Sequence, residues 1–243
     1  MPRTLGWIRQ FHDAESPNCP PLLVFPHAGA GASAYRGFSK ALSKNFDVIV
    51  FQYPGRQDRV AEAPLGSLND MAAGAFEEFS ASQRRCGVPI VTFGHSMGAI
   101  VAFEFVRLAE AHGVEVLRLN ASAAVAPCRA AAMPPHPSDD DGLLDNLTAL
   151  QGTDAAVLAN REIMKLALPV IRADYAAFDA YLCAPEARIA APIHAMAGDK
   201  DPDVTLGDLY DWGKHTAAVT VTMFDGGHFY LESHLDVVAK LLV

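Results

Sequence analysis

The sequence predicts an α/β fold in which helices flank a mostly parallel central sheet. Short apolar runs of strand length alternate along the chain with stretches of helical periodicity, and this pattern favours a sheet covered on both faces. The 243 residues, of which 51% are hydrophobic, are enough for one large domain with a sizeable core. A serine between two glycines stands at the centre of the alternation, after a strand pattern and before a helix pattern.

Seven segments have the length and composition of strands. The first alternates well enough to suit a sheet edge, whereas the others are mostly apolar and suit buried parallel strands. They span residues 6–11, 21–25, 47–51, 89–93, 115–121, 193–197 and 219–224. Between them apolar residues recur at helical spacing, as where Met71, Ala75 and Phe79 share one face. Helices are therefore expected over residues 34–43, 68–85, 99–110, 206–214 and 232–242.

Residues 127–192 interrupt this alternation, because they contain no convincing strand. A proline-rich acidic segment, 133–141, comes first and helical apolar patterns follow it. Pro169 is expected to break or kink the last of these helices. We interpret an inserted helical layer between two core strands as a lid over the site, with helices that only pad the sheet as the alternative. The chain is thus expected to be one domain, 1–243, with a helical lid insertion at about 127–192.

Charge and composition exclude several classes of function. The formal net charge of −9 disfavours nonspecific binding to nucleic acid or to an anionic membrane surface. No apolar run approaches the length of a membrane span, and the first 16 residues lack the apolar centre of a secretion signal. Four widely spaced cysteines, without a C-x-x-C pair, suit reduced thiols in a cytoplasm. They are Cys19, Cys86, Cys128 and Cys183. We expect neither a cofactor nor a metal.

The glycine-flanked serine lies in Gly94-His95-Ser96-Met97-Gly98. G-x-S-x-G between a strand and a helix is the nucleophile elbow of the α/β-hydrolases, whose glycines permit a tight turn that lifts the hydroxyl clear of the sheet. An ordinary glycine-containing turn is the alternative, since the bare motif also occurs by chance. With the strand and helix in place, the motif predicts an α/β-hydrolase fold with Ser96 as nucleophile.

A base must take the proton of the serine hydroxyl, and an acceptor must hold that base in one tautomer. In the elbow fold the partners follow the serine in the order acid, then histidine. His228 comes after the last strand, in a loop where two glycines precede it, and is the predicted base. The other histidines considered are expected to be solvated or structural, with His215 and His234 at the surface.

The acid is expected in the loop after the strand at 193–197, in Gly198-Asp199-Lys200-Asp201-Pro202. Asp201 is preferred because it lies further into the loop, next to a rigid proline, where it can reach the imidazole. Asp199, directly after the strand, is the alternative and is otherwise expected to orient the turn.

Two backbone donors must stabilise the oxyanion of the tetrahedral intermediate. One is the Met97 N–H, at the start of the helix that follows the elbow. The other is expected in the loop at 26–31, where small residues let the backbone approach the substrate, and Ala28 is the expected donor. A phosphate-binding loop is the alternative, but no Gly-Lys-Ser/Thr follows.

Five short motifs follow one another over almost the whole chain. They are Phe25-Pro26-His27-Ala28-Gly29, Gln52-Tyr53-Pro54-Gly55-Arg56, Gly94-His95-Ser96-Met97-Gly98, Gly198-Asp199-Lys200-Asp201-Pro202 and Gly226-Gly227-His228-Phe229-Tyr230. Together they resemble the type II thioesterases, stand-alone partners of polyketide synthases and nonribosomal peptide synthetases. Arg172-Ala173-Asp174-Tyr175, in the predicted lid, resembles that family too.

The resemblance implies a hydrolase that acts on acyl thioesters of the phosphopantetheine arm of a carrier protein, in antibiotic or siderophore biosynthesis. Carried over residue by residue, Ser96, Asp201 and His228 match the catalytic triad, while Met97 and Ala28 match the oxyanion hole. An acyl-Ser96 intermediate that water hydrolyses is implied, as are a carrier-protein partner and a monomeric enzyme.

Two positions depart from the pattern of that family. Ala30 stands where a glycine is common, and Gln57 follows Arg56 where an acidic residue is common. The second departure leaves the role of Arg56 and Arg59 open between a part in the site and a salt-bridged loop at its edge. Two other functions also stay open: an esterase or acyltransferase for free small molecules, and a noncatalytic binding protein that kept the hydrolase fold.

Overall fold

Residues 6–82, 87–150 and 160–243 are described by the computed structural model of the chain. Within them seven strands form one sheet in the order β1-β3-β2-β4-β5-β6-β7. β1 pairs antiparallel with β3, and every other neighbouring pair of these strands is parallel. The bounds are β1 (Ile8–Arg9), β2 (Pro21–Phe25), β3 (Asp47–Phe51), β4 (Ile90–His95), β5 (Val116–Ser122), β6 (Ile193–Gly198) and β7 (Val219–Phe224). The predicted α/β fold is confirmed.

Helices connect the strands close to the predicted positions. They are α1 (Arg36–Leu42), α2 (Leu68–Ala81), α3 (Met97–Ala111), α4 (Asp140–Leu150), α6 (Arg161–Asp179), α7 (Leu206–Tyr210) and α8 (Leu235–Leu242). Short 3-10 turns add η1 (Ala32–Tyr35), η2 (Gln57–Arg59), η4 (Pro127–Ala132), η5 (Asp211–Lys214) and η6 (Tyr230–Glu232). The helix expected at 68–85 ends at Ala81, and 83–86 lie outside the described residues. Among these helices, none has both the length and the apolar composition needed to cross a bilayer.

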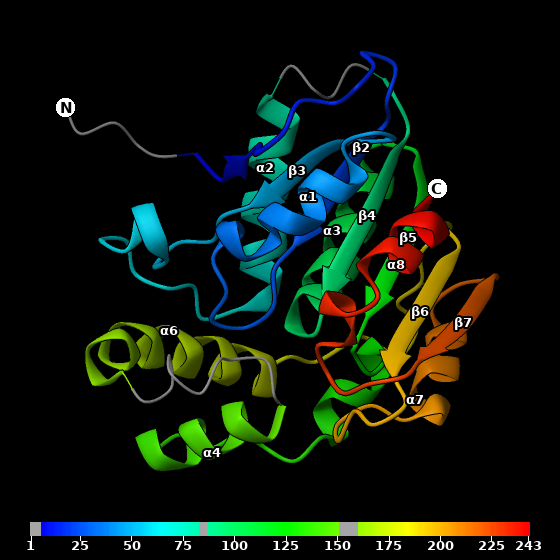
Figure 1. Cartoon of the computed structure of the whole chain (residues 1–243). Helices are drawn as coiled ribbons and strands as arrows, with labels where there is room; N and C mark the ends of the chain where they lie inside the picture. The colour runs from blue at the N-terminus through cyan, green and yellow to red at the C-terminus, as the bar shows by residue number, and fades with distance from the viewer. Residues whose placement is uncertain (1–5, 83–86, 151–159) are drawn as a thin grey trace.

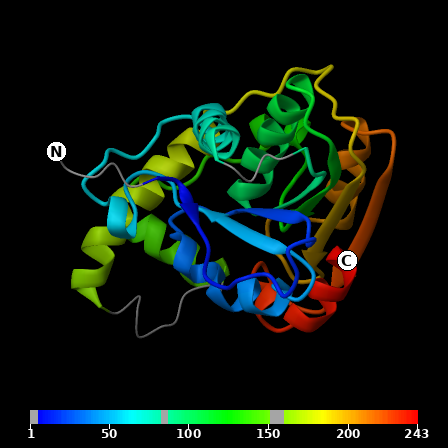
Figure 2. The same ribbon diagram turned by 90° about the horizontal axis from the view of Figure 1, so that it is seen from above.

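Successive side chains of a strand point to opposite faces of the sheet, so the apolar residues form two cores, one on each face. In β2, Leu23 and Phe25 join the core under α2 and α3, while Leu22 and Val24 join the core under α1 and α8. All four side chains are fully buried, as expected for a parallel strand covered on both sides. Figure 2 shows the sheet edge-on between these two layers of helices.

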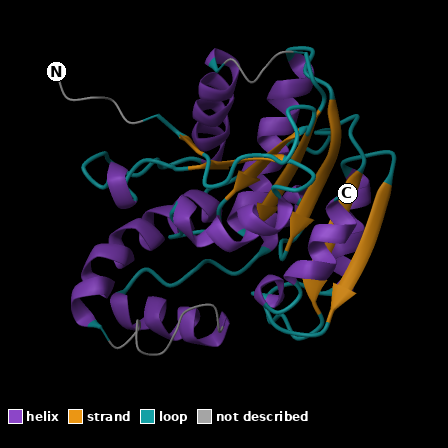
Figure 3. Cartoon of the chain, turned by 45° about the horizontal axis from the view of Figure 1, so that its top comes forward, coloured by secondary structure: helices purple, strands orange, loops and turns teal. Residues whose placement is uncertain are grey.

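The segment between β5 and β6, residues 127–192, contributes α4 and α6 and is called the β5–β6 insertion below. Both helices lie beyond the end of the sheet at which the strand arrows point (Figures 1 and 3). They share a small apolar cluster made of Leu143, Met164, Leu168, Ile171 and Tyr175. The insertion therefore covers the carboxyl ends of the strands, where sites gather in parallel sheets.

Pro169 was expected to break or kink its helix, and the break is wrong, because α6 runs as one helix from Arg161 to Asp179 with the proline inside it. A proline removes one backbone hydrogen bond and crowds the preceding turn. Here Leu168 and Ile171 on either side are both buried in the cluster with α4, and this packing outweighs the local penalty.

His215 was expected at the surface, and this expectation is also wrong. Its side chain is fully buried, with Nδ1 donating to the Ala187 carbonyl at 2.8 Å and Nε2 accepting the Cys128 N–H at 3.1 Å. Burial lowers the pKa of His215, so the neutral ring joins two segments of the β5–β6 insertion to η5. Cys128, like Cys19 and Cys183, is a free thiol, and Cys86 lies outside the described residues.

Candidate active site

Ser96 stands at the sharp turn between β4 and α3. Its backbone has φ 54° and ψ −127°, a conformation that residues other than glycine seldom adopt. The turn depends on the flanking glycines, because a side chain at Gly94 would collide with the Gly98 carbonyl and one at Gly98 with the Phe25 carbonyl. The strand, turn and helix thus form the elbow expected from the sequence.

His228 and Asp201 are in direct contact. Nδ1 of His228 lies 2.8 Å from Oδ2 of Asp201, and the two side chains are 5% and 0% exposed. A carboxylate can only accept, so Nδ1 carries the proton and Nε2 of the neutral ring is left free to act as a base. The second oxygen, Oδ1, accepts the Asp203 N–H at 2.9 Å, which fixes the orientation of the carboxylate.

Asp199, the alternative acid, is engaged elsewhere. Its Oδ1 accepts the Gly226 N–H at 2.9 Å, and the Lys200 N–H donates to the Gly226 carbonyl at 2.8 Å. These bonds join the loop after β6 to the loop after β7, two residues before His228. Asp199 therefore orients the turn, and the side chain that reaches the imidazole is that of Asp201.

Two cavities meet at Ser96 and His228. The larger, of about 330 Å³, and the smaller, of about 200 Å³, share Ala28, Ser96, Tyr175 and His228 in their walls. The larger cavity is also lined by Met97, Met133, Asn146, Phe178 and Val204. The smaller cavity is lined mainly by apolar side chains, among them Leu147, Leu150, Met164, Ile171 and Phe229. The serine, the imidazole and the loop with Ala28 are thus brought together, partly under residues of the β5–β6 insertion.

Two backbone N–H groups next to Ser96 are available to an anionic oxygen. Met97 is the first residue of α3, so its N–H has no acceptor within the helix. In the loop after β2, Gly29 N–H donates to Asp174 Oδ2 at 2.7 Å and Ala30 N–H to the His27 carbonyl at 3.1 Å. No acceptor in the described part of the chain takes the Ala28 N–H. Both predicted oxyanion donors are therefore amides without an acceptor in the described part of the chain.

Two further histidines, which the sequence argument did not single out, lie near His228: the His95 ring contacts the His228 ring, and the His27 ring contacts the His95 ring. The His95 and His228 ring centroids are 5.3 Å apart, and His95 Nδ1 bonds to Ser122 Oγ at 2.9 Å. Burial, and then the charge of a protonated His228, lower the pKa of His27 to about 3 and that of His95 well below its usual value. Both rings therefore stay neutral at neutral pH.

Arg56 and Asp174 form a buried ion pair beside the same loop. Arg56 Nη2 contacts both carboxylate oxygens of Asp174, whose side chain is 0% exposed. Burial raises the pKa of Asp174, while Arg56 and the Gly29 N–H oppose that rise. Asp174 belongs to the insertion segment noted in the sequence, but no local pattern pairs it with an arginine 118 residues away.

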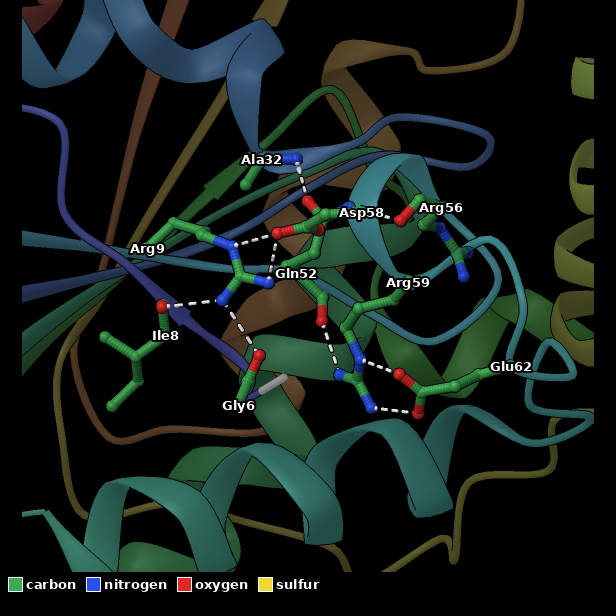
Figure 4. A network of polar contacts seen from close by, with 9 residues as sticks. All are labelled: Gly6, Ile8, Arg9, Ala32, Gln52, Arg56, Asp58, Arg59 and Glu62. Atoms are coloured by element: carbon green, nitrogen blue, oxygen red, sulfur yellow. Dashed lines mark hydrogen bonds and ion pairs between the residues drawn. The ribbon is translucent and has the colours of Figure 1, made fainter. Parts of the chain in front are cut away.

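Arg59, whose role was open, is held in a different ion pair. Its Nε and Nη2 donate to the Glu62 carboxylate at 2.7 and 2.6 Å, and Nη1 donates to the Gln52 carbonyl at 2.7 Å (Figure 4). Arg56 and Arg59 are thus both salt-bridged, but only Arg56 reaches a residue bonded to the loop with Ala28.

Asp201, Asp203 and His228 also lie close enough to be considered as metal ligands, with one ligand atom of each within 4.8 Å of the others. Asp201 Oδ2 already accepts from His228 Nδ1, and Asp201 Oδ1 accepts from the Asp203 backbone. This arrangement fits an imidazole held in one tautomer better than a coordination shell.

Comparisons with known proteins agree with this geometry. A family model described as thioesterase domain matches residues 20–242. The chain is 43% identical over 244 residues to the phenyloxazoline synthase MbtB of Mycobacterium tuberculosis, covering all of this chain but only 17% of that protein. It is 40% identical over 231 residues to the thioesterase PikA5 of Streptomyces venezuelae, covering 93% of this chain and 80% of that one.

Solved structures of the same overall shape include two described as type II thioesterases. One is BorB from the borrelidin biosynthetic cluster, with a TM-score of 0.85, 38% identity and 98% of each chain covered. The other is YbtT from the yersiniabactin pathway, with a TM-score of 0.85, 27% identity and 98% of this chain and 97% of that chain covered.

Proposed function

The chain belongs to the thioesterase family, a family of hydrolases, and from this premise we propose that it is a type II thioesterase of polyketide or nonribosomal peptide biosynthesis. Its substrates would be acyl thioesters on the phosphopantetheine arm of carrier proteins. The observation that carries the proposal is the meeting of Ser96 with His228 at the junction of two cavities, with the imidazole bonded to Asp201.

In the proposed mechanism, Ser96 Oγ attacks the thioester carbonyl while Nε2 of His228 accepts its proton. The Ala28 and Met97 N–H groups stabilise the oxyanion, and Asp201 stabilises the imidazolium. Collapse of the intermediate breaks the carbon–sulfur bond, His228 returns the proton to the sulfur, and acyl-Ser96 remains. Water, deprotonated by the same histidine, then releases the carboxylic acid and regenerates the serine.

We further propose that residues 1–243 form one domain and that the β5–β6 insertion acts as its lid. Tyr175 of α6 is in the walls of both cavities, and Leu147 of α4 is in the wall of the smaller one. A thioester bound at Ser96 would therefore lie against both helices. A lid that admits a long arm has to move relative to the sheet, and such motions commonly set the rate of enzymes of this kind.

The proposed partner is an acyl- or peptidyl-carrier protein, met by a monomeric enzyme in the cytoplasm. The three free thiols are in keeping with that compartment. The net charge of −9 does not favour nucleic acid or an anionic membrane as partners. The proposed chemistry needs no cofactor, since all its proton transfers run through His228.

The proposal is tested by comparing hydrolysis of an acyl-loaded carrier protein, the matching acyl-pantetheine and a p-nitrophenyl ester. We expect the highest kcat/KM for the carrier-bound thioester. Equal or higher values for the free compounds would instead favour an esterase or acyltransferase for small molecules. A panel of chain lengths on the carrier would then define the preferred acyl group.

A fluorophosphonate, which reacts with activated serines, tests whether the chain is an enzyme at all. We expect one adduct, located on Ser96 by mass spectrometry, and its loss in Ser96→Ala. Absence of an adduct on the wild-type chain would favour the noncatalytic binding protein.

A further inference from the structure

We propose that the Arg56–Asp174 ion pair is a positioning device that fixes the direction of the Ala28 N–H from helix α6. The inference rests on the proposed function, because an oxyanion forms only when Ser96 attacks an acyl group. It assigns a role to two buried charges that take no part in proton transfer. It also makes the shape of the oxyanion hole depend on how the β5–β6 insertion is seated.

Both peptide planes that flank Ala28 are held by hydrogen bonds. The His27–Ala28 plane is fixed by its carbonyl, which accepts the Ala30 N–H at 3.1 Å, so the Ala28 N–H points the opposite way. The Ala28–Gly29 plane is fixed by its N–H, which donates to Asp174 Oδ2 at 2.7 Å. Among the hydrogen bonds of the described residues, the bond to Asp174 is therefore the one restraint on these two planes that comes from outside the loop.

Helix α6 is seated directly on the same loop. A side chain added at Gly29 would collide with Ile171, one turn before Asp174, and Gly29 itself has φ +74°. Tyr175, the next residue along α6, lines both cavities together with Ser96. Ile171, Asp174 and Tyr175 of α6 thus face the loop and the reacting centre. Asp174 is the charged residue of the three.

The core side of the ion pair is held without any help from α6. Arg56 Nη1 donates to the Pro54 carbonyl at 2.6 Å, and the guanidinium lies 5.0 Å from the centre of the Tyr53 ring. Gln52 Nε2 donates to the Arg56 carbonyl at 2.8 Å, while Gln52 Oε1 accepts the Ala32 N–H at 2.6 Å (Figure 4). The position of Arg56 is therefore fixed, and Gln52 links it by hydrogen bonds to Ala32 at the start of η1.

Burial makes the two charges depend on each other. The side chains are 2% and 0% exposed, and a buried charge without its partner is strongly unfavourable. The Asp174 carboxylate is therefore held next to the Arg56 guanidinium, and the same carboxylate accepts the Gly29 N–H. Loss of the charge on Asp174 loosens this restraint even when an oxygen atom remains at that position.

A matched buried carboxylate lies away from the site, on α3. Glu104 is 6% exposed and accepts from Arg107 Nη1 at 2.7 Å and from Tyr181 Oη at 2.6 Å. Like Asp174, it pairs with one arginine and one further donor, but it touches no residue of the loop with Ala28 among the described contacts. Glu104→Gln therefore controls for the loss of a buried charge as such.

The test compares Asp174→Asn, Arg56→Lys and Glu104→Gln with the wild-type chain. For each we would measure kcat and KM on an acyl-pantetheine thioester, and the inhibition constant of an alkylboronic acid, whose tetrahedral adduct on serine imitates the oxyanion. We expect Asp174→Asn to lower kcat about 10- to 100-fold with little change in KM, and to weaken the boronate by a similar factor. Arg56→Lys keeps a cation, so its losses in kcat and in boronate affinity should be smaller than those of Asp174→Asn. Glu104→Gln should change neither quantity by more than about threefold.

A folded Asp174→Asn protein, shown by its melting temperature, with kcat and boronate affinity equal to those of Glu104→Gln would overturn the inference. If that variant does not fold, equal values for Arg56→Lys and Glu104→Gln would overturn it in the same way. A wild-type chain that binds the boronate but hydrolyses no thioester would overturn the proposed function instead. The ratio of boronate affinities between variant and wild type would still decide the role of the ion pair.

Discussion

The central sheet and the β5–β6 insertion are held in place by different kinds of contact. In the sheet, side chains such as Leu22 and Leu23 of β2 are fully buried in two large apolar cores. Part of the insertion, including Ala177, Tyr181 and Ile189, joins the larger core, whereas α4 and α6 meet in one small apolar cluster, and Asp174 bonds to the loop after β2. Stability is therefore spread over many residues in the sheet, and it depends on fewer residues where α4 packs against α6. Substitutions should separate the two accordingly.

The largest expected effect concerns the chemistry that the sheet carries. Ser96→Ala should lower the hydrolysis rate by about 10⁴- to 10⁶-fold, because no other group can form the acyl intermediate. The melting temperature should hardly change, since Ser96 is only partly buried at the mouth of the cavities. Steady-state kinetics and thermal unfolding of the same preparation check both statements, and near-native turnover would contradict the assignment of the nucleophile.

The two aspartates of the loop after β6 give a sharper contrast within the sheet. Asp201→Asn should lower kcat by about 10⁴-fold, because an amide no longer holds the imidazole in the required tautomer. Asp199→Asn should lower it by less than about tenfold, since Asp199 bonds to the Gly226 N–H and not to His228. Kinetics of both variants on one thioester decide the matter, and the reverse ranking would move the acid to Asp199.

Truncation of one leucine in each region tests how the two regions unfold. Leu23→Ala should lower the free energy of unfolding by about 2–5 kcal/mol, because the sheet cannot close the cavity left behind. Leu143→Ala, equally buried but in the small cluster of the insertion, should lower it by only about 1 kcal/mol and mainly speed local opening of α4. Urea unfolding and hydrogen exchange measure the two effects. Equal losses would mean that insertion and sheet unfold together.

The smallest expected effect is a dependence of stability on pH that originates in the sheet. Burial, with a contribution from Arg118, lowers the pKa of His194 on β6 to about 4. The unfolded chain then binds more protons than the folded chain between pH 6.5 and 4, so the contribution of His194 to stability is complete above pH 6.5 and declines as the pH falls towards 4.

His194→Asn should flatten this decline, because the titrating ring is gone while an amide can still bond to Thr222. Urea unfolding at pH 7, 6 and 5 measures the slope for the wild type and the variant. An unchanged slope would assign the acid sensitivity to other groups, with the buried His95 as the next to be replaced.

The parts of the molecule that the sequence predicted well are those set by local patterns. Strands β2, β3 and β7 have the predicted bounds. In β2 and β3 the apolar runs are buried on both faces of a parallel strand, whereas β7 is an edge strand in which only Phe224 is buried. The elbow was predictable because two glycines, a strand and a helix are adjacent in sequence. The choice of Asp201 over Asp199 depended on loop position alone, and the hydrogen bond to His228 agrees with it.

What the sequence could not provide are polar partners that lie far apart along the chain. Arg56 and Asp174 carry no periodicity that would pair them, and their role became visible only through the Gly29 N–H between them. His215 was misplaced because the two backbone groups that bond to its ring, the Ala187 carbonyl and the Cys128 N–H, come from segments distant in the sequence. The continuation of α6 past Pro169 could not be predicted for a related reason, since the packing between α4 and α6 is not encoded in the residues beside the proline.

The unusual backbone of Ser96 also bears on the stage of folding at which a newly made chain can become active. A turn of this shape gains nothing by itself and persists only when β2, β4 and α3 enclose it, as the close approach of Gly98 to Phe25 requires. We therefore expect no thioester hydrolysis from a chain in which these elements have not yet assembled, so the proposed activity would depend on the completed fold.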